Sequence, residues 1–294
     1  MKKRKWFGLL LMGLLLGGCD GLTGNGEEDP ELAGVRFNIR IVAEAAEELA
    51  DLENMASALE MRGLTATLLL APELVQANCA QVQALQEAGF EIMAYASAQE
   101  IDGQSVTLSM LSEQEQTDYL QAIKEAFDEC LAIPVEGFGC GGFDQNDFTW
   151  GILDAQGYTY NLGFLAHSCL NLPGHEGAFI PYLDDGYDFW SVPMCSAYVN
   201  KRWTPLSDAS FINQVDATEW EALLKEQFDL MDTLGRPLMV EVYARHTGEN
   251  EPWLDALMNI IAYARQKDAV FVSVEELITW VQSQADSLDC NCLQ

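Results

Sequence analysis

The residues of this sequence that could carry out chemistry are few and widely spaced. Three histidines occur, His167, His175 and His246, and the acidic run LDDGYD contributes Asp184 and Asp185 a few residues after the second of them. Imidazole and carboxylate groups together hold divalent metals and activate a bound water molecule. All three histidines follow or lie near expected strands, so a metal site is geometrically possible. They share no ligand spacing, however, and loop histidines beside a solvated acidic turn are the alternative.

Aromatic side chains offer a second kind of chemistry, the binding of sugar rings. Six of them lie at or near the ends of expected strands: Tyr95, Phe138, Phe143, Trp190, Trp203 and Tyr243. Aromatic faces stack on the apolar side of sugar rings, and acidic loops accept hydrogen bonds from hydroxyl groups. Core packing is the alternative for each of these side chains.

The eight cysteines suit an exported protein. Cys169 and Cys195 bracket a loop-rich stretch and could form a disulfide, although connectivity cannot be deduced from sequence. Paired CxxC clusters, which would indicate a structural zinc site, do not occur in the sequence. Cys140, in GFGCGG, could suggest a nucleophile, but a lone cysteine among glycines is more often structural. A GxSxG nucleophile elbow does not occur either.

The first residues have the pattern of a secretion signal. The basic run MKKRKW is followed by the apolar run FGLLLMGLLLG and by LGGC, which ends at Cys19. This order resembles the lipobox of bacterial lipoproteins, in which cleavage precedes a cysteine that then carries acyl chains. We therefore expect a signal peptide at 1–18, lipidation of Cys19 and attachment to the bacterial cell membrane outside the cytoplasm. A plain secretory signal is the alternative.

Charge and composition limit the kinds of partner that this chain could bind. Residues 19–33 are rich in Gly, Asp and Glu without periodicity, which predicts a flexible acidic tether. Removal of residues 1–18 would leave 11 basic residues against 46 acidic ones, a net charge of −35. Such a chain is repelled by nucleic acid and by anionic lipid, so neither is an expected partner. The lipid anchor would be the link to the membrane.

The remainder alternates between strand and helix patterns. Apolar runs typical of strands lie at 35–42, 64–71, 90–95, 135–139, 158–164, 188–194, 237–244 and 269–273. Helix patterns lie at 43–63, 72–89, 111–130, 146–157, 217–235, 252–266 and 274–285. This alternation predicts an α/β fold with mainly parallel strands, and the number of units suits a barrel. We expect one domain at 34–284 and a cysteine-containing tail at 285–294.

Several segments resemble one known family in order and spacing. LQEAGFEIMAYASAQEI is similar to the motif aaGhEIgnHsysH, VEGFGCGGFDQ to fRpPyG with the strand before it, and the segment from GRPLMVEVYARHTG to the terminal ELITW to the family's closing motifs. The family is that of the polysaccharide deacetylases, the NodB-homology carbohydrate esterases, and the resemblance spans residues 35–282. It implies a distorted (β/α) barrel of the polysaccharide deacetylase type. It also implies an activity in which a divalent metal, held by an aspartate and two histidines, hydrolyses N-acetyl groups of glycans.

The residues that carry this chemistry in the family are not matched here. IRIVAEAAE stands where TFDDG belongs, and the nearest acids, Glu44 and Glu47, suit a solvated helix face. Tyr95 and Gln99 stand at the metal histidines, Gly139 at the arginine, and Tyr243 at the late histidine. A neutral phenol and an amide are poor ligands for zinc. The sequence therefore predicts a degenerate site with no metal cofactor.

Three functional hypotheses remain. The first is a catalytically silent envelope lipoprotein that binds a glycan or an envelope protein. The second is an active hydrolase on the C–N bonds of acetylated glycans, with zinc held by relocated ligands among His167, His175, His246, Asp184 and Asp185. The third is a structural or assembly lipoprotein for which the barrel is only a platform.

Overall fold

Strand β1 (Arg36–Ala43) begins the fold in this computed structural model, which describes residues 34–168 and 170–287. All eight of its residues are buried, as expected for a parallel strand covered on both faces. It pairs with β12 and β2 on its two sides, and with β13 at its amino-terminal end. Because β1 lies between β12 and β2, its carboxyl end lies between the carboxyl ends of these two strands.

The main sheet is parallel except at one edge, where β8 and β9 pair antiparallel. Its strands, in pairing order, are β12 (Leu238–Tyr243), β1, β2 (Thr67–Leu70), β3 (Glu91–Ala96), β6 (Gly137–Cys140), β7 (Tyr160–Asn161), β9 (Trp190–Ser191) and β8 (Tyr182–Leu183), with β13 (Val270–Phe271) beside β1. The sheet curls into a half-barrel and leaves β12 and β8 as its two ends. This architecture agrees with the α/β barrel that the sequence predicts.

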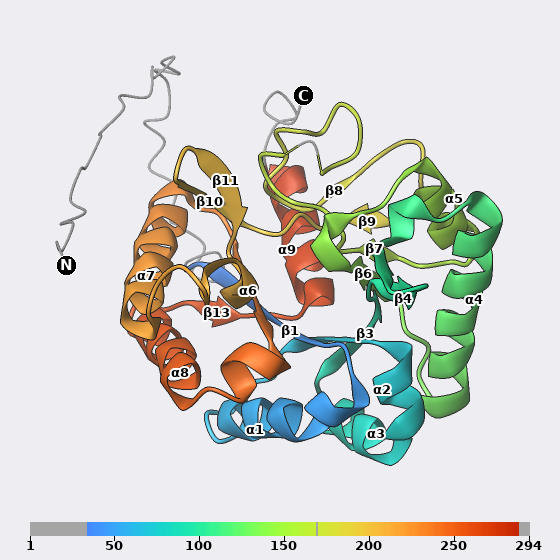
Figure 1. Ribbon diagram of the computed structural model, residues 1–294. Helices are drawn as coiled ribbons and strands as arrows, with labels where there is room; N and C mark the ends of the chain where they lie inside the picture. Colours follow the sequence, from blue (N-terminus) through green and yellow to red (C-terminus); the bar gives the residue numbers. More distant parts are fainter. Residues whose placement is uncertain (1–33, 169, 288–294) are drawn as a thin grey trace, which may run out of the picture. The chain divides into compact units, whose positions relative to one another are not determined.

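Helices cover the outer face of the curled sheet (Figure 1). They are α1 (Leu49–Glu60), α2 (Pro72–Ala77), α3 (Cys79–Glu87), α4 (Glu113–Cys130), α5 (Asp147–Ala155), α7 (Ala217–Leu234) and α8 (Glu251–Arg265). The last helix, α9 (Val274–Ser287), lies instead in the middle of the view in Figure 1. Local sequence explains their ends. Ser112 and Glu115 form a capping box at the start of α4, and Gly235 ends α7 in the left-handed conformation at φ 60°.

The concave side of the sheet carries polar side chains that bond to one another. Asn38 donates a hydrogen bond of 3.0 Å to the Thr67 hydroxyl, which donates one of 2.6 Å to Glu91. Glu91 also accepts the backbone N–H groups of Val274 and Glu275 at the start of α9. Burial raises the pKa of Glu91, while these hydrogen bonds lower it. The amino-terminal half of the concave side is thus a connected polar network.

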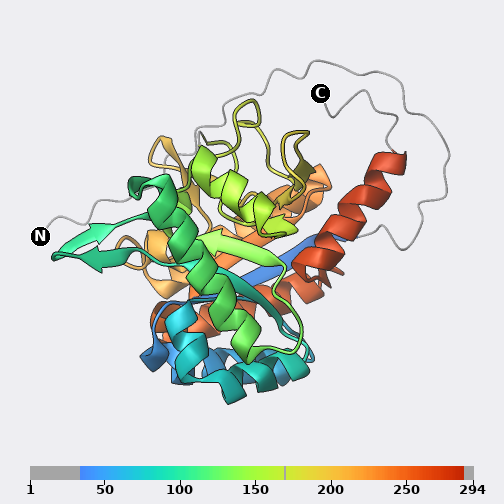
Figure 2. The same ribbon diagram turned by 90° about the vertical axis from the view of Figure 1, so that its right-hand side faces the viewer.

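Sequence patterns located most elements but missed the irregular ones. The predicted helix at 72–89 is two helices, because the Asn78 side chain bonds the carbonyls of Ala46 and Leu74 at the break. The predicted strand at 158–164 pairs over two residues only. The elements that were not predicted include strand β8, the hairpins β4–β5 (Gln99–Ile101 and Gln104–Val106) and β10–β11 (Ser196–Val199 and Arg202–Pro205), and the short helix α6 (Asp208–Phe211). Figure 2 shows the β4–β5 hairpin projecting from the sheet.

A disulfide joins Cys79, at the start of α3, to Cys130, at the end of α4. Cys195, which the sequence offers as a partner for Cys169, is a free and buried thiol. Its Sγ donates to the Pro237 carbonyl and accepts the Met239 N–H. Cys169 itself lies outside the described residues.

Several predictions concern segments that the structure does not describe. The signal peptide at 1–18, Cys19 and the acidic tether lie outside the described residues, as do residues 288–294 of the predicted tail. Within the part that is described, none of the helices has both the length and the apolar character to cross a bilayer.

Reduction of the Cys79–Cys130 disulfide should destabilise the domain. The bridge closes a loop with a sequence separation of 51, and removing such a constraint costs about 2–4 kcal/mol. Urea unfolding with and without reductant measures this loss. The double variant Cys79→Ser/Cys130→Ser should be insensitive to reductant, and an equal response in that variant would contradict the assignment.

Candidate functional site

The described residues line an open cavity of about 540 Å³ at the carboxyl ends of β6 and β12. This end of a parallel sheet is where ligand sites of α/β proteins form. Side chains come from four places: the ends of β6 and β12, the segment after β7, the β10–β11 hairpin and α6. The residues used below are Cys140, Arg202, Trp203, Thr204, Ser207, Glu241 and Tyr243.

The β10–β11 hairpin supplies an aromatic wall. The Trp203 ring is 43% exposed and stacks on the His167 ring with centroids 4.3 Å apart, while Tyr198 meets it edge-on. The His167 ring also stacks on Phe179, and the Arg236 guanidinium lies 3.5 Å from the centroid of the Phe179 ring. Burial and the Arg236 charge lower the pKa of His167, so its ring is neutral at pH 7. His167 therefore supports the Trp203 ring.

A pair of tyrosines crosses the strand-end face. Tyr95, the last residue but one of β3, and Tyr243, the last of β12, place their hydroxyl oxygens 3.1 Å apart. Both side chains are buried, and burial raises the pKa of both phenols well above the ordinary value. These neutral hydroxyls satisfy each other across the curled sheet.

Glu241 is a buried carboxylate two residues before Tyr243, on the same face of β12. It is 7% exposed and lines the cavity. Its neighbour across the β1–β12 pairing is Arg40, whose guanidinium donates to Asn38 and to the Val192 carbonyl. Burial raises the pKa of Glu241 to about 7, and the Arg40 charge opposes this shift.

Asp208, in α6, links this cavity-lining helix to the end of β12 by hydrogen bonds. Its carboxylate accepts the Tyr243 N–H at 3.0 Å and the Thr247 hydroxyl at 2.7 Å. Burial raises the pKa of Asp208 to about 7, although these hydrogen bonds lower it. The role of Asp208 is to position Tyr243, because its oxygens face protein donors.

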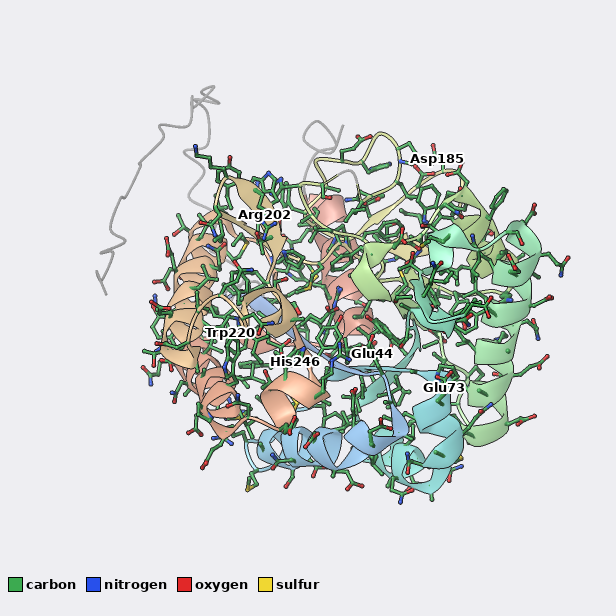
Figure 3. The ribbon with its side chains drawn as sticks, in the orientation of Figure 1. Glu44, Glu73, Asp185, Arg202, Trp220 and His246 are labelled. Atoms are coloured by element: carbon green, nitrogen blue, oxygen red, sulfur yellow. A yellow bond between two sulfur atoms is a disulfide. The ribbon has the colours of Figure 1, made fainter. Side chains whose placement is uncertain are left out.

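Arg245 binds the acids that follow β1. Its guanidinium pairs with Glu44 and, at 3.5 Å, with Glu48, and it lies 4.5 Å above the Tyr243 ring. Glu44 is thus half-buried and ion-paired, contrary to the solvated position predicted for it, whereas Glu47 is exposed. The reason is that Arg245, in the π-helical turn η4 (Ala244–Gly248), reaches back over the end of β1. Figure 3 labels Glu44 and His246 in this region.

Of the two other expected cleft positions, Gly139 lies beside Tyr95, whereas Gln99 belongs to a separate hairpin. Gln99 begins the β4–β5 hairpin, and its side chain bonds Tyr119 of α4. Gly139 lies against Tyr95 in β6, where an added Cβ would stand 2.8 Å from Leu69 Cδ2. A larger residue at Gly139 would therefore displace Leu69.

The alternative metal ligands are also dispersed. His175 Nε2 lies 3.0 Å from Asp184 and its ring stacks on Tyr182, whereas Asp185 is exposed. His167 belongs to the aromatic wall, and His246 lines a separate hollow beside Arg245. Among residues 34–168 and 170–287, no three His, Cys, Asp or Glu side chains come together as a metal-ligand set. Tyr95 and Gln99 stand at the metal positions of the resemblance. The Tyr95 phenol bonds the Tyr243 phenol, and Gln99 offers only an amide, so these two groups do not fit a divalent metal.

Of the six aromatic candidates, Phe143, Trp203 and Tyr243 line the cavity, and Phe138 is core.

Sequence reasoning missed Glu241, although its signal was present. A carboxylate in the middle of the apolar run PLMVEVYA, in register with a late-strand tyrosine, is unusual for a buried strand. Arg202, Thr204 and Ser207 carried no such signal.

The raised pKa of Glu241 predicts a dependence of stability on pH. The folded state holds this proton more tightly than the unfolded state, so the free energy of unfolding should fall as pH rises from about 4.5 to about 7. Glu241→Gln removes this term. Between pH 4.5 and pH 8, the free energy of unfolding of the variant should therefore rise by about 1–3 kcal/mol relative to that of wild type. Urea unfolding at both pH values measures the difference, and a constant difference would contradict the assigned shift.

Comparison with known proteins gives a result at the level of structure only. No family model matches the sequence, and no curated protein does. Solved structures do match. A probable polysaccharide deacetylase from Pseudomonas aeruginosa PAO1 superposes with a TM-score of 0.65 at 14% identity, covering 84% of this chain and 91% of that one.

Two further neighbours show how varied the chemistry of this fold is. PuuE allantoinase superposes with a TM-score of 0.65 at 12% identity, over 84% of this chain and 90% of that one. A CE4 family pseudoenzyme from Bacillus anthracis superposes with a TM-score of 0.52 at 13% identity, over 82% of this chain and 65% of that one. Identities this low establish the fold and leave the activity open. The described domain therefore has the fold of the polysaccharide deacetylases.

Proposed function

We propose that this protein is a lipid-anchored glycan-binding protein of the bacterial cell envelope, and that it lacks the metal-dependent deacetylase chemistry of its structural neighbours. The cavity between β6, β12 and the β10–β11 hairpin is the binding site. The observation that carries the proposal is the composition of this cavity: an exposed indole beside buried hydroxyl groups that have no partner.

Trp203 offers the face on which a sugar ring would stack. The adjoining Thr204 and Ser207 side chains are 6% and 3% exposed, and their hydroxyls have no hydrogen-bond partner within the described part of the chain. Both residues line the cavity. Leaving a buried polar group without a partner costs about 1–3 kcal/mol, and a polyhydroxylated ligand could supply the missing bonds. A cavity of about 540 Å³ has the size of small-ligand sites.

The residues at the former chemical positions support the loss of catalysis. The Tyr95 and Tyr243 hydroxyls bond each other, and Gln99 bonds Tyr119. Arg245 brings a fixed positive charge to the acids after β1. A cation at this place disfavours a second one by repulsion. The strand-end face is therefore suited to holding a ligand and not to activating water on a metal.

The anchor follows from the amino-terminal motif alone. Acyl chains on Cys19 would hold the protein at the membrane, and the acidic residues 20–33 would separate the domain from it. With this anchor the cavity would lie outside the cytoplasm, where envelope glycans occur.

Replacement of Trp203 by alanine should weaken glycan binding. Loss of the stacking surface should lower the affinity for the best-binding envelope oligosaccharide at least about tenfold, equivalent to about 1.4 kcal/mol. A glycan array selects the ligand, and calorimetry measures the affinity. Phe148→Ala, which removes an exposed aromatic residue of α5 away from the cavity, is the matched control. No glycan binding by wild type, or equal binding by Trp203→Ala, would favour the platform hypothesis.

Acetylated glycan oligomers should release no acetate on incubation with the protein, with or without zinc. An enzymatic acetate assay measures the release. Zinc-dependent release that disappears in His167→Ala or His246→Ala would contradict the proposal and establish the relocated-ligand hydrolase. Release that persists in both variants would contradict it too, because it would require a hydrolytic site elsewhere.

A further inference from the structure

The Glu241 carboxylate is the group in the cavity that a neutral sugar does not explain. It is 7% exposed, and in the described ranges no hydrogen-bond donor or cationic group lies within bonding distance of its oxygens. Thr204 and Ser207 can rotate their hydroxyls towards a ligand or towards water. A carboxylate only accepts hydrogen bonds, and its ionised form needs a donor or a cation when buried.

The protein around Glu241 does not supply that partner. The charge of Arg40 acts on Glu241 and lowers its pKa, but the Arg40 guanidinium donates its hydrogen bonds to Asn38 and to the Val192 carbonyl. The titratable and charged groups that surround Glu241 or line its cavity are Arg40 from β1, Tyr95 from β3, Cys140 from β6, Arg202 from β11, Asp208 from α6 and Tyr243 from β12. The two phenols and the thiol are neutral because burial raises their pKa values. The Asp208 carboxylate accepts hydrogen bonds from the Tyr243 N–H and the Thr247 hydroxyl.

We infer that Glu241 is the recognition site for an ammonium group of the ligand, and that the cavity prefers hexosamine units with a free amino group to N-acetylated ones. The inference rests on the proposed glycan-binding function and specifies its ligand. A protonated amine donates charge-assisted hydrogen bonds and neutralises the buried carboxylate at the same time. An acetamido group offers one neutral N–H and leaves the charge in place.

The shape of the site favours an amine carried by a ring. Trp203 and Glu241 line the same cavity, so a ring stacked on the indole could extend a short substituent towards the carboxylate. A primary amine bonded directly to the ring is compact, whereas an acetyl group adds a carbonyl and a methyl group that would have to fit beside the buried charge. Arg202, exposed on the hairpin, also lines the cavity (Figure 3).

Calorimetric titration of the full domain with two oligosaccharide series tests the inference. Fully deacetylated and fully N-acetylated glucosamine oligomers of equal length are compared at pH 7.5 and 0.15 M salt. We expect the free-amine series to bind at least about tenfold more tightly, because a charge-assisted hydrogen bond contributes about 1.5–3 kcal/mol. Glu241→Gln should abolish this preference.

A control is needed because the whole chain is strongly acidic and attracts any polycation. Glu53→Gln removes one exposed carboxylate of α1 and should leave the preference intact. The preference should also persist at 0.5 M salt, since contacts at a buried carboxylate are screened less than surface attraction.

The outcomes separate this inference from the function on which it rests. Equal or tighter binding of the acetylated series would overturn the inference and leave glycan binding standing. A preference that survives in Glu241→Gln would also overturn it, and circular dichroism shows whether that variant is folded. Absence of binding by both series would contradict the glycan-binding proposal as well.

Discussion

Burial of polar groups on the concave side of a curled parallel sheet is the constraint on which the rest of this structure depends. Water is largely excluded there, so each polar side chain needs a partner within the protein or from a ligand. Asn38, Thr67 and Glu91 satisfy one another at the amino-terminal half. At the carboxyl half, Tyr95 and Tyr243 do the same, while Glu241 is left facing the cavity. This difference between the two halves indicates that the candidate ligand site lies at the carboxyl half.

Side-chain contacts link the strands of this sheet at their carboxyl ends. A metal centre would tie several strands together through its ligands. Here the Tyr95–Tyr243 hydrogen bond links β3 to β12, and the Arg245 pairs with Glu44 and Glu48 link η4 to the end of β1. The same scaffold includes hydrolases and pseudoenzymes among its solved structures. Its activity is decided by a few residues at these ends.

Local periodicity made the framework predictable, while long-range contacts decided the site. Apolar runs located β1, β3 and β12, and Ser112 marked the start of α4 because capping is a local interaction. The β10–β11 hairpin was not predicted, because its sequence SAYVNKRWTP has no apolar alternation, yet it provides Trp203. His167 is a metal candidate by residue type and a support for Trp203 by position. Such roles follow from packing between segments distant in sequence.

The most direct test of this account is a crystal structure of the domain bound to a deacetylated glucosamine oligomer. The account predicts a sugar ring stacked on Trp203, with its amino nitrogen within hydrogen-bond distance of the Glu241 carboxylate. Thr204 or Ser207 should bond the ring hydroxyls. A ligand bound elsewhere on the surface, or a divalent metal coordinated at the ends of β1 and β3, would contradict it.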